Sequence, residues 1–109
     1  MIYEGKYLTT MGEVFDEALN IAKYTPHKAK DFLDKYARYI ESVEGITYGE
    51  ALARAKSNLG YFAGYYDSQT CDLIYNTYVT EHPVFGKKPY GVSPEDAFKA
   101  GLEAGYKYK

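Results

Sequence analysis

The clearest helical signal in this sequence lies in residues 10–42, TMGEVFDEALNIAKYTPHKAKDFLDKYARYIES. Thr10 and Glu13 have the spacing of a capping box, in which a hydroxyl and a carboxylate each accept a backbone N–H where a helix begins. Pro26 ends this helix, because the residue before a proline avoids helical angles, and it also suits the first position of the next helix. The stretch therefore predicts two consecutive helices, over residues 11–24 and 26–42.

Apolar residues recur every three or four positions in both segments, as on the buried face of a helix. In the first segment they are Val14, Phe15, Ala18, Leu19, Ile21 and Ala22. In the second they are Ala29, Phe32, Leu33, Tyr36, Ala37 and Ile40, and charged residues fill the opposite face. Both helices are expected to bury one face in a common core.

Similar signals predict three more helices. Thr47 and Glu50 repeat the capping spacing before a helix that should run from residue 48 to 65 or 66, and another should span about 69–80. Ser93 and Pro94 start a last helix, over about 94–106. The apolar stripe expected on the third helix is Leu52, Ala55, Leu59, Phe62, Ala63 and Tyr66.

These elements predict an all-α fold, a single compact bundle of about five helices formed by one domain over residues 1–109. Residues 81–93, EHPVFGKKPYGVS, contain two prolines and two glycines, so we expect a long ordered loop there. Residues 1–9 are expected to be extended or flexible. A weak signal also allows the N-terminal residues to pair with the 81–93 loop.

Composition excludes several classes of protein. A length of 109 residues suits one domain, and a net charge of -2 gives no strong field for a polyanion or a membrane surface. The start of the chain lacks the pattern of a signal peptide, and no apolar run approaches the roughly 18 residues that suggest a membrane span. With a single cysteine as well, the sequence predicts a cytoplasmic protein.

The residues needed for catalysis or metal binding are sparse. Cys71 stands near a predicted helix N-terminus but has no histidine close to it in sequence, and we interpret it as an inert core residue. His27 and His82 lack the spacing of metal ligands, and GKKPYG lacks the strand–turn–helix context of a phosphate loop. The sequence therefore predicts no catalytic residue, no metal and no cofactor, and we expect no enzymatic activity.

The unusual feature is aromatic, since the chain has 14 tyrosines. Tyrosine combines an apolar ring with a polar tip, so it suits both the boundary of a core and an interface. Tyr61, Phe62, Tyr65 and Tyr66 are clustered in six residues. One interpretation is a central helix buried on all sides. The other is a contact surface for a protein partner or a second copy of the chain, formed by Tyr61, Tyr65, Tyr66, Phe85 and Tyr90.

Three segments, NLGYFAGYYD at 58–67, HPVFG at 82–86 and SPEDAFKAG at 93–101, resemble short proteins encoded by bacteriophages, prophages and related mobile elements. That group has no established activity, so the resemblance implies no cofactor or catalytic residue. It implies a small accessory protein inside a bacterial host cell that binds a host or phage component.

Three functions remain open from the sequence. The leading hypothesis is a non-enzymatic accessory protein that acts through protein–protein contacts, with a homodimer as one form of that contact. The alternative is a helical protein that binds DNA and regulates transcription, with Arg54, Lys56, Ser57 and Asn58 on its recognition helix. DNA affinity comes mostly from neutralised phosphates, and the net charge disfavours this alternative. The third is an enzyme of unknown type.

Overall fold

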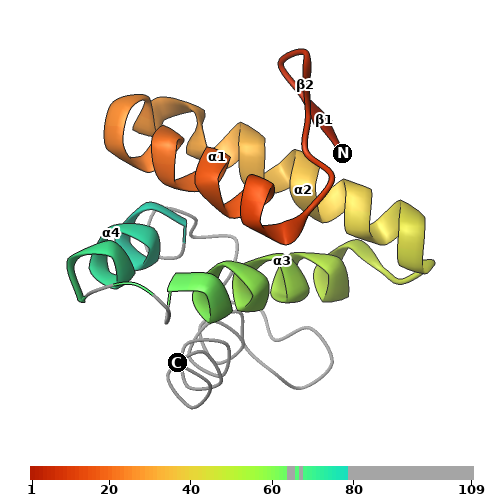
Figure 1. Cartoon of the computed structure of the whole chain (residues 1–109). Helices are drawn as coiled ribbons and strands as arrows, with labels where there is room; N and C mark the ends of the chain where they lie inside the picture. The colour runs from red at the N-terminus through yellow and green to blue at the C-terminus, as the bar shows by residue number, and fades with distance from the viewer. Residues whose placement is uncertain (64–65, 67, 79–109) are drawn as a thin grey trace.

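The computed structural model describes residues 1–63, 66 and 68–78, in which four α-helices follow a small β-hairpin (Figure 1). The strands are β1 (Ile2–Tyr3) and β2 (Lys6–Tyr7). A single 3-10 turn, η1 (Pro26–Lys28), separates the first two helices. The helices are α1 (Met11–Tyr24), α2 (Ala29–Glu44), α3 (Tyr48–Ala63) and α4 (Ser68–Tyr78). The chain is mostly helical, as predicted, and the described residues contain four of the about five helices expected.

The hairpin departs from the predicted all-α class, and it lies in residues 1–9, which were expected to be extended or flexible. Residues 2–7 pair with themselves in an antiparallel register that places Ile2 opposite Tyr7 and Tyr3 opposite Lys6. Glu4 and Gly5 form the turn, with φ of 49° and 80°. Two consecutive residues with positive φ are the mark of a type I′ turn, whose twist matches that of the two strands it joins. A two-residue loop is therefore enough to fold the N-terminal segment back on itself.

The start of α1 has the capping box expected from the sequence. The Glu13 N–H donates to the Thr10 hydroxyl at 3.1 Å, and the Thr10 N–H donates to the Glu13 carboxylate at 3.0 Å. Helix α2 begins later than predicted, because Pro26–Lys28 form the 3-10 turn instead of the first α-helical turn. At its other end Gly45 adopts a φ of 67°, in the left-handed region that commonly ends helices.

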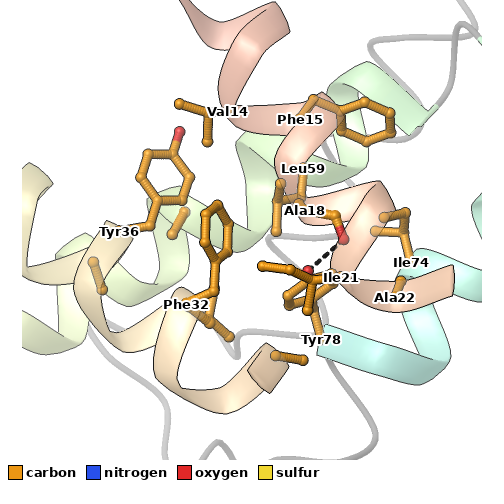
Figure 2. Packing of buried hydrophobic residues seen from close by; sticks show 14 of the residues in the cluster. Val14, Phe15, Ala18, Ile21, Ala22, Phe32, Tyr36, Leu59, Ile74 and Tyr78 are labelled. Carbon is orange, nitrogen blue, oxygen red and sulfur yellow. Dashed lines mark hydrogen bonds between the residues drawn. The ribbon is translucent and has the colours of Figure 1, made fainter. Parts of the chain in front are cut away.

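The core lies between the helices and is centred on Phe32 of α2 (Figure 2). The Phe32 ring is 5.0 Å from the Tyr3 ring, 6.4 Å from the Tyr36 ring and 6.3 Å from the Tyr78 ring, measured between centroids. The hairpin, α2 and α4 thus meet around one aromatic side chain. Every apolar residue predicted for the inner face of α2 is buried.

Two predictions about α3 are changed by the structure. The apolar stripe expected to include Tyr66 is not buried there, since Tyr66 is exposed and lies outside α3. Lys56, proposed for a DNA-reading face, is buried. It lies one helical turn from both Leu52 and Leu59, so it belongs to the buried stripe.

Several predictions fall outside the described residues. These are the last helix over 94–106, the 81–93 loop and its pairing with the N-terminal residues, and the positions of Tyr65, His82, Phe85 and Tyr90.

Candidate functional site

Two of the five predicted contact residues, Tyr61 and Tyr66, lie within the described part of the chain. They belong to an aromatic cluster built on Phe15 of α1. The Phe15 ring is 6.0 Å from the Phe62 ring and 5.1 Å from the Tyr66 ring, and the Tyr61 ring is 5.9 Å from that of Phe62. Phe15 is fully buried, whereas 39% of Tyr66 is exposed. The structure therefore places Tyr61 and Tyr66 in one cluster at the boundary between core and surface.

A second apolar surface, which the sequence interpretation missed, lies on the hairpin. Successive side chains of a β-strand point to opposite faces. Tyr3 is buried, whereas Ile2 and Tyr7, which stand directly opposite each other, are 60% and 73% exposed. We call Ile2 and Tyr7 the outer face of the hairpin. The sequence carries little signal for this face, because each strand has only two residues and both Ile2 and its buried neighbour Tyr3 are apolar.

Polar contacts position the hairpin against the helices. Lys6 of β2 forms an ion pair with Glu17 of α1 at 3.0 Å, and Glu4 in the turn forms one with Lys28 at 3.1 Å. Exposed ion pairs contribute only about 0–1 kcal/mol, so the burial of Tyr3 against Phe32 provides most of the anchoring. These contacts place the outer face on the side of the hairpin opposite to Tyr3.

Three tyrosine hydroxyls connect the helices to one another. The Tyr36 hydroxyl donates to the Met11 sulfur at 3.0 Å and accepts from the Asn58 amide at 2.9 Å. Tyr78 of α4 donates to the Ala18 carbonyl oxygen of α1 at 2.5 Å (Figure 2). Tyr48 likewise donates to Asp34 at 2.7 Å. Part of the tyrosine content thus serves to join helices.

These environments raise the pKa values of the tyrosines involved. Burial is the largest cause for Tyr36 and Tyr48, whose pKa values rise to about 12, and for Tyr78, whose pKa rises further. Tyr3 also reaches a pKa of about 12, through burial and then the negative charges of Glu4 and Asp31. Its hydroxyl is buried without a hydrogen bond of good geometry, although Asp31 is close enough to affect its titration.

At the start of α1, the hydroxyl of Thr9 and then the backbone N–H groups of Thr10 and Thr9 lower the pKa of Glu13. All of these bonds stabilise the charged carboxylate. The shift therefore reflects the cap of α1 and requires no catalytic explanation.

Three basic residues on α2 and α3 lie beside carboxylates. Lys35 pairs with Asp31, Arg54 with Glu44, and Arg38 with both Asp34 and Glu41. A phosphate backbone would have to compete with these carboxylates, which weakens the electrostatic attraction that dominates binding to DNA. Together with the burial of Lys56, this pairing disfavours the proposed recognition helix.

Cys71 and His27, the other described residues considered for catalysis or metal binding, lie in ordinary structural positions. Cys71 is buried and its thiol lies 3.0 Å from the Ala63 carbonyl oxygen, whereas His27 is exposed. Within the described ranges, no group of three or more His, Cys, Asp or Glu side chains could hold a metal ion.

A polar pocket of about 440 Å³ lies between the hairpin turn and the C-terminal end of α1. Its lining includes the side chains of both hairpin ion pairs, together with Asn20, Tyr24 and Thr25. The pocket therefore contains equal numbers of ammonium and carboxylate groups, each already paired across it.

No protein-family model matches this chain, and comparisons with curated proteins and with solved structures yield no significant match. Among the described helices, none is both long and apolar enough to span a membrane.

Proposed function

We propose that this chain is a small non-enzymatic accessory protein that acts inside a bacterial cell by binding another protein of the host or phage. The observation that carries the proposal is the outer face of the hairpin, where Ile2 and Tyr7 are largely exposed on an element that packs against the helices through Tyr3. Tyrosine is enriched at protein interfaces because its ring supplies apolar area and its hydroxyl a hydrogen bond.

The outer face is a stronger candidate than the aromatic cluster. The rings of Tyr61 and Tyr66 pack on Phe62 and Phe15, so part of their apolar surface already serves the fold. Tyr7, by contrast, keeps most of its surface in solvent. Two side chains cannot supply the roughly 800 Å² that each partner buries in a standard interface. The proposed contact therefore extends from the outer face onto the surface around it.

Affinity capture from a bacterial lysate, followed by mass spectrometry, tests the proposal with a matched set of variants. The wild-type chain should recover one stoichiometric protein, and the double variant Ile2→Ser, Tyr7→Ser should lose it. The control is Tyr39→Ser, Val43→Ser, which removes an exposed tyrosine and an exposed aliphatic residue from α2. This control should recover the same protein as the wild type.

The other outcomes are equally informative. Loss of the partner in Tyr61→Ala, Tyr66→Ala but not in the hairpin variant would move the contact to the aromatic cluster. Dimerisation of the purified chain in sedimentation equilibrium, abolished by the hairpin variant, would identify a second copy as the partner. Recovery of no stoichiometric protein, with a monomeric chain, would contradict the proposed function.

A further inference from the structure

We draw no further inference here: the strongest candidate, the polar pocket of about 440 Å³ between the hairpin turn and the C-terminal end of α1, selects no class of ligand, because its four charged side chains already neutralise one another in the Lys6–Glu17 and Lys28–Glu4 ion pairs.

Discussion

The hairpin and the helical core use tyrosine in opposite ways. Tyr78 buries its ring against Phe32 and donates its hydroxyl to α1, so the whole side chain serves the fold. Tyr7 contacts solvent over 73% of its surface and faces away from the helices. Tyr3 lies between these extremes, with a buried ring and a poorly satisfied hydroxyl. The difference shows that tyrosine occupies two kinds of position here, buried ones that join the helices and an exposed one on the hairpin.

The largest expected effect is at the centre of the core. Phe32→Ala should lower the free energy of unfolding by about 3–5 kcal/mol, because it removes the ring that Tyr3, Tyr36 and Tyr78 all contact. Phe32→Leu, which keeps most of the apolar volume, should cost clearly less. Urea unfolding followed by circular dichroism measures both variants, and equal stability of Phe32→Ala and the wild type would remove Phe32 from the centre of the core.

Buried and exposed tyrosines should ionise at different pH values in alkaline solution. Tyr36 and Tyr78 have folded-state pKa values above the value of about 10 expected in the unfolded chain. Their contribution to stability is therefore complete below pH ~10 and is lost as the pH rises further, because the unfolded state releases these protons first. Each should remove up to about 1.4 kcal/mol per pH unit in that range.

The measurement is a titration of tyrosinate absorbance alongside circular dichroism. A first group of tyrosines should ionise while the helical signal is intact, and the remainder should ionise together with unfolding. Ionisation of all tyrosines in one step before any loss of helix would show that burial does not raise the pKa values of Tyr36 and Tyr78.

Removing single hydroxyls distinguishes buried tyrosines that form a good hydrogen bond from those that do not. Tyr78→Phe should cost about 1 kcal/mol, because it deletes a buried hydrogen bond to the Ala18 carbonyl oxygen. Tyr3→Phe should leave stability unchanged or raise it, since the lost hydroxyl is buried without a well-formed bond. Thermal unfolding of the two variants measures these costs. A larger loss of stability in Tyr3→Phe than in Tyr78→Phe would show that the Tyr3 hydroxyl is the better satisfied of the two.

The smallest effect on stability is expected at the outer face. Ile2→Ser, Tyr7→Ser removes one exposed cross-strand pair, and such pairs contribute roughly 0.2–1 kcal/mol. Its unfolding midpoint should stay close to that of the control Tyr39→Ser, Val43→Ser. A strongly destabilised hairpin variant would mean that these side chains serve the fold and would undermine their use as a contact surface.

Helical periodicity and capping residues were sufficient to locate the four described helices, with a later start for α2 than predicted. Thr10, Glu13 and Thr25-Pro26 fixed both ends of α1 as the structure has them, and the spacing from Ala29 to Ile40 identified the buried face of α2. These signals act within one or two turns of chain, so they can be recognised without knowledge of the tertiary structure.

The hairpin and the burial of Lys56 were missed for different physical reasons. Each strand has only two residues, which is too short for alternation to be recognised, and Glu4-Gly5 is a less familiar turn pair than Asn-Gly or Asp-Gly. Lys56 was treated as a surface residue because of its charge, although its spacing from Leu52 places it on the buried stripe. Because the hairpin was not predicted, its two exposed residues were not recognised as a candidate site.

Chemical footprinting of the tyrosines tests the central claim most directly. Nitration by tetranitromethane, read by mass spectrometry, should modify Tyr7 and Tyr24 readily in the free chain, because 73% and 77% of these side chains are exposed. Tyr3 and Tyr78, which are buried, should react slowly. In the complex recovered from lysate, Tyr7 should become protected while Tyr39 on α2 keeps its rate. Nitration of Tyr7 at the same rate in the complex and in the free chain would contradict the assignment of the outer face as the partner contact.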